Sequence, residues 1–330
     1  MTGIDDVARA AGVSTATVSR ALSGRGVVSA ATREKVLAVA GELGYVVSVA
    51  ASSLASGRAQ SIGVLVPLPD LWFFSTVVSA ISGRLLPHGY DITLFNLTEN
   101  PAERRVLFDR SLRRGRIDGL IVLSAWLSAA EQAELAALDV PVVGIGPSPA
   151  LPTLVVDDVA VGRAATAHLL ALGHRDIAHI GQSDGDDFHI PTLRRRGWEQ
   201  ALTDAGIAPR DDLYAAGDFT LEGGRAAARR LLTGPAPTAI FAASDEMAVG
   251  ALVAARDLGL AVPGDVSIVG VDGHELSRFF DLSTVDQFPH AQGERVADAM
   301  LAALGELEAP AEVGLPFELV VRGSSAAPPA

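Results

Sequence analysis

From residue 61 onward the chain alternates short apolar runs with amphipathic segments, and this alternation restricts the fold more than any other feature. The runs are SIGVLV (61–66), DITLFN (91–96), DGLIVLS (118–124), PVVGIG (141–146), DIAHIG (176–181), TAIFAA (238–243) and DVSIVGVD (265–272). Runs of this kind are typical of buried parallel strands joined by crossover helices. Four runs precede residue 150 and three follow it, which predicts an α/β fold with two doubly wound parallel-sheet subdomains. A ligand site is expected in the cleft at the carboxyl ends of these strands.

The first 45 residues have a different, all-helical pattern. Apolar residues recur at helical spacing in three short segments, beginning at Ile4, at Val18 and at Val36. Each segment has one narrow apolar stripe, so the three must pack together. Gly12 permits a tight turn between the first two, while Ser14 and Ser29 can cap the second and third helices. The pattern predicts a helix-turn-helix.

Charge is distributed unevenly between these two regions. Residues 1–60 carry six basic and four acidic side chains, a formal charge of +2. The whole chain has a formal charge of -13, so the remaining 270 residues carry -15. A mildly basic head on an acidic body indicates different partners for the two parts. The segment 46–60, VVSVAASSLASGRAQ, is small, polar and poor in charge, and is expected to be a linker with some helical tendency.

Several protein classes are excluded by what the sequence lacks. It has no cysteine, which excludes disulfides and thiolate metal sites, and no pair of histidines has metal-ligand spacing. No apolar stretch reaches about 18 residues and no secretory leader is recognisable, so we expect a cytoplasmic protein without a membrane span. Neither a phosphate-binding loop nor a nucleophile elbow is present, so we expect neither an enzyme nor a bound cofactor.

Two sets of longer motifs stand out in the chain. Residues 4–45 read IDDVARAAGVSTATVSRALSGRGVVSAATREKVLAVAGELGY, and the body contains, in this order, LLALGHRDIAHIG, RRRGW, PTAIFAASDEMAVGAL and VPGDVSIVGVDG. The first stretch resembles, without a gap, the DNA-binding domain of the lactose/galactose-repressor (LacI/GalR) family of bacterial transcription regulators. The body segments resemble that family's ligand-binding core in the expected order.

The resemblance implies a domain arrangement. It predicts a helix-turn-helix domain (1–45), a hinge helix (46–60) and a periplasmic-binding-protein-like core (61–325). The two core subdomains would comprise about 60–159 plus 288–315, and 160–287 plus 316–325. Residues 326–330 are expected to be a disordered tail, because SSAAPPA offers little to bury. A homodimer, which could pair into a tetramer, would bind double-stranded operator DNA.

The resemblance assigns the second head helix to the DNA major groove. The residues placed there are Ser14, Thr15, Ala16, Thr17, Ser19 and Arg20. Small side chains let the backbone approach closely, and Arg20 can make a bidentate contact with guanine O6 and N7. Taken without the resemblance, the same residues would describe an N-capped, neutral surface helix.

The family's hinge is matched less well than its head. Ala51 and Leu54 fall where the family contacts DNA, with Leu54 as a wedge in the minor groove or as a packing residue between two hinge helices. The family's hinge begins Tyr-x-Pro-Asn, whereas this chain reads YVVS at 45–48. Loss of the proline removes a fixed φ at the start of the hinge.

The resemblance also points to residues around the cleft. The candidates are Phe73, Phe74, Ser124, Arg194, Phe219, Ser244 and Asp272. Aromatic faces suit a sugar ring or a purine plane, and an arginine beside a carboxylate suits ring hydroxyls. Ser244 could instead be a helix cap. The predicted function is a small-molecule-controlled repressor with a sugar or sugar-derivative effector; a co-repressed, purine-type regulator is the alternative, and a sugar-binding enzyme or a transport protein fits less well.

Overall fold

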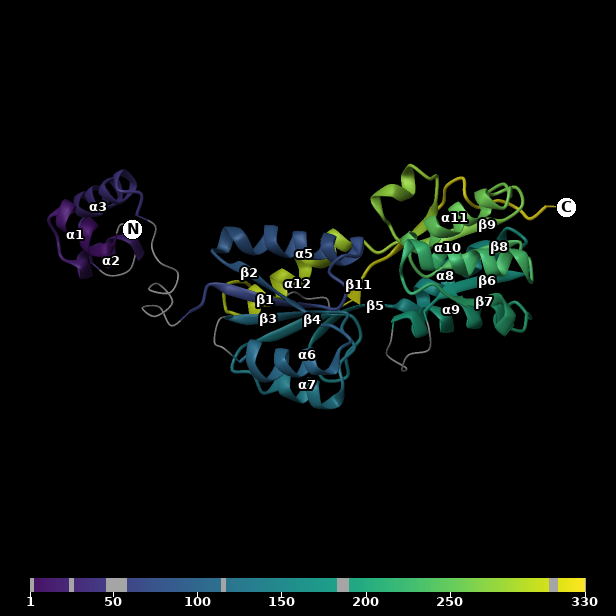
Figure 1. Ribbon diagram of the computed structural model, residues 1–330, viewed down its shortest axis with the longest axis horizontal. Coiled ribbons are helices and arrows are strands. Elements are labelled where there is room, and N and C mark those ends of the chain that lie inside the picture. Colours follow the sequence, from purple (N-terminus) through teal and green to yellow (C-terminus); the bar gives the residue numbers. More distant parts are fainter. Residues whose placement is uncertain are drawn as a thin grey trace. The chain divides into compact units, whose positions relative to one another are not determined.

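The computed structural model describes residues 3–23, 27–45, 58–113, 117–182, 190–308 and 314–329. Its residues group into two units, one made of 1–60 with 115–118 and the other of 61–114 with 119–330. Figure 1 shows the helical head of the first unit and the α/β core formed by the second. Within the described ranges, no helix is both long and apolar enough to cross a membrane.

In its described residues the head contains three helices packed on one another. They are α1 (Ile4–Ala11), α2 (Thr15–Ser23) and α3 (Ala30–Glu42). The buried side chains are Val7, Ala8, Ala11, Val18, Ala21, Val36 and Ala40. Gly12 ends α1 with a φ of 68°, a left-handed conformation that glycine adopts at little cost. Ser29 caps α3 by accepting a hydrogen bond from the Thr32 N–H at 3.2 Å, which confirms this part of the predicted pattern.

The first core subdomain is built on an all-parallel sheet with the order β11-β5-β4-β3-β1-β2. Its strands are β1 (Ser61–Val66), β2 (Asp91–Asn96), β3 (Gly119–Leu123), β4 (Val142–Ile145), β5 (Thr153–Val156) and β11 (Gly314–Leu315). Its helices are α5 (Trp72–Leu85), η1 (Leu86–His88), α6 (Pro101–Val106), η2 (Leu107–Ser111), α7 (Ala129–Ala136) and α12 (Pro289–Ala303). In Figure 1, α5 and α12 lie on one face of this sheet and α6 and α7 on the other.

The second subdomain has the order β12-β10-β9-β8-β6-β7, in which only the β10–β12 pair is antiparallel. Its strands are β6 (Ile177–Gly181), β7 (Tyr214–Ala216), β8 (Ala239–Ala242), β9 (Ser267–Asp272), β10 (Ser283–Asp286) and β12 (Glu318–Val320). Its helices are α8 (Asp158–Ala171), α9 (Ile190–Asp204), η3 (Asp211–Leu213), α10 (Leu221–Thr233), α11 (Asp245–Asp257) and η4 (Glu275–Arg278). Helix α8 packs on α9, and α10 packs on α11.

Both sheets place their first strand between the second and the third, so each has a point where the connections diverge. This point lies between β1 and β3 in one sheet and between β6 and β8 in the other. Ligands of open parallel sheets bind outside the carboxyl ends of strands at such points. The predicted α/β fold with two doubly wound subdomains is confirmed, and the topology directs attention to these strand ends.

The C-terminal segment differs from the prediction of a disordered tail. The Ala326 carbonyl accepts a hydrogen bond from the buried His174 ring at 2.8 Å, and its N–H donates to Ser267 Oγ at 3.0 Å. Ser324 is buried, and its Oγ accepts from the Ser283 N–H at 2.8 Å. The prediction is wrong at Ala326, because composition does not reveal that the buried His174 and Ser267 offer partners to its backbone.

Candidate DNA-binding surface and effector cleft

Helix α2 presents a face of small and hydroxylated side chains with one guanidinium. Val18 and Ala21 point into the head's core, whereas Ser14, Thr15, Ala16, Ser19 and Arg20 are exposed and Thr17 is half-buried. Ser14 Oγ accepts from the Thr17 N–H at 3.2 Å and so caps the helix. Arg20 Nε donates to the Ala16 carbonyl at 3.1 Å, which lays its side chain along the exposed face. Such a face lets a helix backbone approach the floor of a groove.

A cavity of about 290 Å³ lies in the core at the carboxyl ends of strands from both sheets. Leu68 follows β1, Ser124 follows β3 and Gly146 follows β4 on the first side. Gln182 follows β6, Asp272 ends β9 and Gln287 follows β10 on the second side. The topology therefore explains why residues more than 200 positions apart line one site.

Arg194, on α9, is the centre of a buried charged network on the second side. It is 4% exposed. Its Nε donates to Asp158 Oδ1 at 2.9 Å, its Nη1 to the Ala243 carbonyl at 2.5 Å and its Nη2 to Gln287 Oε1 at 3.0 Å. Gln287 Nε2 donates in turn to Asp272 Oδ1 at 2.8 Å. We call Asp158, Arg194, Asp272 and Gln287 the cleft floor.

Burial dominates the titration of the acids of the cleft floor. It raises the pKa of Asp272 to about 7, even though Arg194 Nη1 lies 3.7 Å from Asp272 Oδ1 and favours the charged form. It also raises the pKa of Asp158, against the opposing effect of the Arg194 ion pair. Desolvation destabilises a carboxylate more than one shared guanidinium restores. Further hydrogen-bond donors would therefore stabilise the charged form of both carboxyls.

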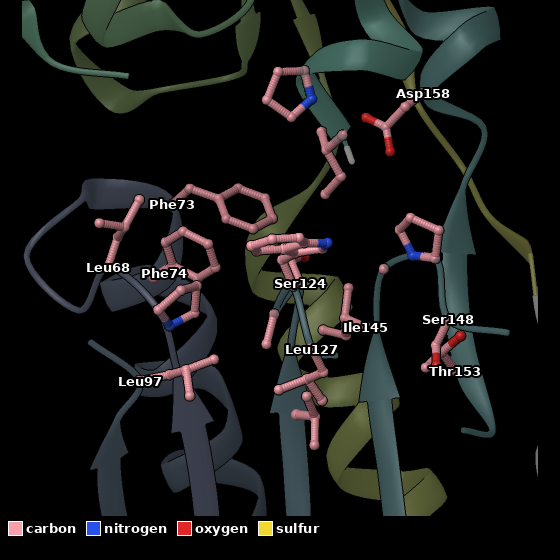
Figure 2. A pocket seen from close by; sticks show the side chains of 18 of the residues that line it. Leu68, Phe73, Phe74, Leu97, Ser124, Leu127, Ile145, Ser148, Thr153 and Asp158 are labelled. Atoms are coloured by element: carbon pink, nitrogen blue, oxygen red, sulfur yellow. The ribbon is translucent and has the colours of Figure 1, made fainter. Parts of the chain in front are cut away.

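The first side of the cavity carries a group of apolar side chains beside the polar lining residues Glu99, Arg104 and Gln132. Phe73 and Phe74, at the start of α5, pack edge to face with ring centroids 5.4 Å apart. Figure 2 shows their rings beside Leu68 and Leu97, away from Asp158. Trp126, Leu127 and Ile145 continue this lining toward β3 and β4. The apolar wall is our name for these side chains: Leu68, Phe73, Phe74, Leu97, Trp126, Leu127 and Ile145. This wall can cover a flat ring or the C–H face of a sugar.

The two sides of the cavity also touch directly. The Trp72 indole stacks on the His274 ring with centroids 4.3 Å apart, and the backbone N–H of Trp72 donates to Glu246 Oε1 at 3.3 Å. Trp72 begins α5 in the first subdomain, whereas His274 and Glu246 belong to the second. These contacts depend on how closely the subdomains approach, so they connect cleft geometry to subdomain arrangement.

Three residues of the cavity have a backbone conformation that side chains rarely adopt. Their φ angles are 42° at Ser124, 56° at Phe219 and 121° at Asp272. Such strain persists only where the surrounding fold imposes it, and it gathers at ligand sites. Among the described residues, no cluster of histidine or acidic side chains could hold a metal ion.

Comparison with known families agrees with both halves of this description. Residues 3–48 match the family of bacterial regulatory proteins called the lacI family, and residues 166–325 match a periplasmic binding protein-like domain. The HTH-type transcriptional regulator DegA of Bacillus subtilis (strain 168) is 36% identical over 338 residues, which cover 98% of each chain.

The chain belongs to the lacI family of bacterial regulatory proteins.

Solved structures of lacI-family proteins share its fold. A lac repressor dimer bound to operator and the anti-inducer ONPF has a TM-score of 0.85 and 30% identity, with 99% of each chain covered. A complex of the transcriptional regulator CelR with cellobiose has a TM-score of 0.72 and 30% identity, covering 98% of this chain and 100% of that one. This lacI-family chain is therefore a DNA-binding transcription regulator, as its sequence predicts.

The cavity brings together six of the seven effector residues predicted for this lacI-family regulator. They are Phe73, Phe74, Ser124, Arg194, Phe219 and Asp272. Ser244 is not part of the described lining: it is 1% exposed, and its Oγ accepts from the Met247 N–H at the start of α11. On the DNA side, α2 carries its predicted residues, while Ala51 and Leu54 lie outside the described residues.

Sequence reasoning missed several residues that complete the cleft of this lacI-family regulator. Asp158 follows β5, whose sequence TLVV was not counted among the apolar runs. Gln287 follows β10, whose sequence STVD is largely polar and contains no apolar run. Trp126 lies in the loop after β3. The signal for Asp158 was the pair Asp157–Asp158 directly after TLVV, since acids at a parallel strand end face the ligand crevice.

Proposed function

We propose that this lacI-family regulator is a homodimeric repressor whose operator affinity depends on a sugar or sugar derivative bound in the cavity. It would act on operator DNA in the cytoplasm, with Ser14 to Thr17, Ser19 and Arg20 of α2 in the major groove. Ala51 and Leu54 of the hinge would add contacts in the minor groove. We assign no chemical reaction to the cleft.

One observation carries the proposal: a buried, hydrogen-bonded charged floor and an apolar wall from different subdomains line one cavity. A ligand that contacts both subdomains has different affinities for their open and closed arrangements, which is the condition for shifting an equilibrium between them. Ring hydroxyls can pair with the carboxylates and guanidinium, and C–H faces can cover the aromatic rings. The similarity to CelR, solved with cellobiose, supports a sugar.

A purine-type co-repressor is the second candidate. It is favoured by the aromatic residues Phe73, Phe74, Trp126 and Phe219, which could enclose a purine plane. The two candidates differ in sign, because an inducer weakens operator binding whereas a co-repressor strengthens it.

The experiment is a thermal-shift screen of sugars and purines on the purified full chain, followed by operator titrations with the compounds that bind. Operator duplexes would be selected from random-sequence DNA. We expect a sugar to raise the melting temperature and to weaken operator binding. A purine that strengthens operator binding would replace the first candidate by the second, and ligands that bind without changing operator affinity would refute both.

A further inference from the structure

The arginines of the cavity are already engaged by the protein. Among the described lining residues, Arg104 and Arg194 are the basic ones. Arg194 donates to Asp158, to the Ala243 carbonyl and to Gln287. Arg104 Nε and Nη2 donate to the two carboxylate oxygens of Glu131 at 2.7 and 2.8 Å, a bidentate pair of near-ideal geometry. An anionic ligand would have to compete with these acceptors for either guanidinium.

Carboxyl groups outnumber these arginines in the described lining. They are Glu99, Asp158, Glu246 and Asp272. Burial raises the pKa of Asp158, Glu246 and Asp272, which reports that negative charge is already costly in this space. A phosphate or carboxylate on the ligand would add a further desolvated negative charge beside them. The cavity therefore favours a ligand without negative charge.

The cleft floor suits a ligand that can both donate and accept hydrogen bonds. Ionised carboxylates only accept hydrogen bonds and a protonated carboxyl also donates one, while protein donors already fill part of the capacity of Asp158 and Asp272. Ligand hydroxyls can donate to what remains, and they also accept bonds. A polyol ring meets this requirement without bringing charge.

The apolar wall favours a ligand that also has an apolar surface. Phe73, Phe74, Leu97 and Leu127 offer rings and alkyl groups on the side of the cavity away from Asp158 (Figure 2), and Trp126 also lines the cavity. A bare sugar can lay one C–H face on this surface, but hydroxyl groups surround that face, so part of the surface would stay against water. A flat unsaturated group fills the space between aromatic rings and is held there by stacking.

Building on the proposed function, we propose that the effector is an uncharged, two-ended molecule: a hydroxylated ring held by the cleft floor, carrying a flat apolar group that lies on the apolar wall. Two kinds of compound share this chemistry, aryl glycosides and nucleosides. They differ in the flat group, which is a hydrocarbon ring in the first and a base with polar edges in the second.

The experiment measures ligand binding to the full chain by calorimetry in the absence of DNA, using matched pairs. Phenyl glycosides of several hexoses are compared with the methyl glycosides, nucleosides with ribose, and each of these with its phosphate ester. We expect the flat group to tighten binding by about tenfold or more and the phosphate to weaken it by at least as much. The pair that binds most tightly distinguishes a glycoside from a nucleoside.

Two variants test whether the flat group of the ligand lies on the apolar wall. Trp126 is 62% exposed in a loop, so Trp126→Ala should leave the fold intact. It should remove most of the gain from the flat group, so that the phenyl and methyl glycosides bind with nearly equal affinity. Leu86→Ala, at a surface leucine that is 63% exposed and is not part of the described lining, is the matched control and should change neither.

Several results would overturn the proposal. A phosphate ester that binds more tightly than its neutral parent would show that the floor attracts anions. Three further results would exclude a two-ended ligand. They are equal affinities with and without the flat group, equal losses of affinity for both ligands in Trp126→Ala, and no binding by any uncharged compound at millimolar concentration. Because these measurements contain no DNA, they can fail while a different ligand still controls operator affinity, so the proposed function is tested separately.

Discussion

Arg20 in the head and Arg194 in the core are both assigned to ligands here, yet the protein holds them in opposite ways. Arg20 is exposed on α2, and its Nε donates to the carbonyl of its own helix at Ala16. Arg194 is 4% exposed and donates to three groups from three different segments of the core. An exposed guanidinium can turn toward a base edge at little cost, whereas a buried one is part of the fold. Substitution of the first should therefore affect binding alone, and substitution of the second should affect both binding and stability.

The largest effect is expected for Arg20→Ala. A bidentate arginine–guanine contact contributes about 1–3 kcal/mol, so a dimer with two half-sites should lose roughly 30-fold or more in operator affinity. Stability of the core should not change. Fluorescence anisotropy at fixed salt, with operator and scrambled duplexes, measures the specificity ratio.

Arg9→Ala is the matched control for Arg20. Arg9 lies on α1 and pairs with Asp6 at 3.1 Å. Arg9 is not among the residues assigned to the groove, so its removal should leave the ratio of operator to scrambled binding unchanged. If Arg20→Ala kept the wild-type specificity ratio, the assignment of Arg20 to a base would be wrong.

The next effect concerns stability. Arg194→Met leaves Asp158 buried without its charged partner, which typically costs about 3–5 kcal/mol. The buried indole of Trp198 reports unfolding of the same subdomain. Arg195→Met is the control, since Arg195 pairs with the partly exposed Glu199 and should cost about 1 kcal/mol or less. Similar losses in both variants would contradict the structural role of the cleft floor.

The pH dependence of stability should change in Asp272→Asn. Burial raises the pKa of Asp272 to about 7 from an ordinary value of 3.8. The folded protein therefore holds this proton more tightly than the unfolded chain does, and the resulting stability is present below pH 4 and is lost as the pH rises toward 7. Asparagine does not titrate, so the unfolding free energy of the wild type relative to Asp272→Asn should fall over this interval. Arg20→Ala should follow the wild-type profile, and a flat difference for Asp272→Asn would refute the assignment.

The smallest effect is expected for Ser244→Ala. Ser244 caps α11 through the Met247 N–H at 3.2 Å, and loss of an N-cap costs about 1 kcal/mol. Effector affinity measured by calorimetry should stay the same, because Ser244 is not part of the described lining. Ser128→Ala, which removes the exposed cap of α7, is the control for a cap elsewhere in the core. Loss of effector binding without loss of stability would restore Ser244 as a ligand contact.

The contrast between head and core also explains what the sequence could predict. The head's helices and caps depend on local spacing, so Gly12, Ser14 and Ser29 were found where the structure has them. Long buried strands such as β1 and β9 were found for the same reason. The strand β10 reads STVD and has no apolar run, and the run TLVV of β5 was not recognised as a strand, so the floor residues after them were missed.

The cleft was predictable only in part because its polar network is non-local. Arg194 and Gln287 are 93 positions apart, and no spacing in the sequence relates them. The resemblance to a known family located Arg194 and Asp272, but it gave no reason for Asp158. The ordered tail was missed for a similar reason, since His174 reaches the Ala326 carbonyl across 152 positions.

The most direct test of ligand-controlled repression is an operator titration of the full chain at fixed salt, with and without a compound that saturates the core. Wild-type affinity should change by about tenfold or more, while Asp272→Ala should bind operator normally and show no change. An unchanged wild-type affinity, at a ligand concentration where calorimetry shows the core to be full, would contradict the claim that the cleft controls the head.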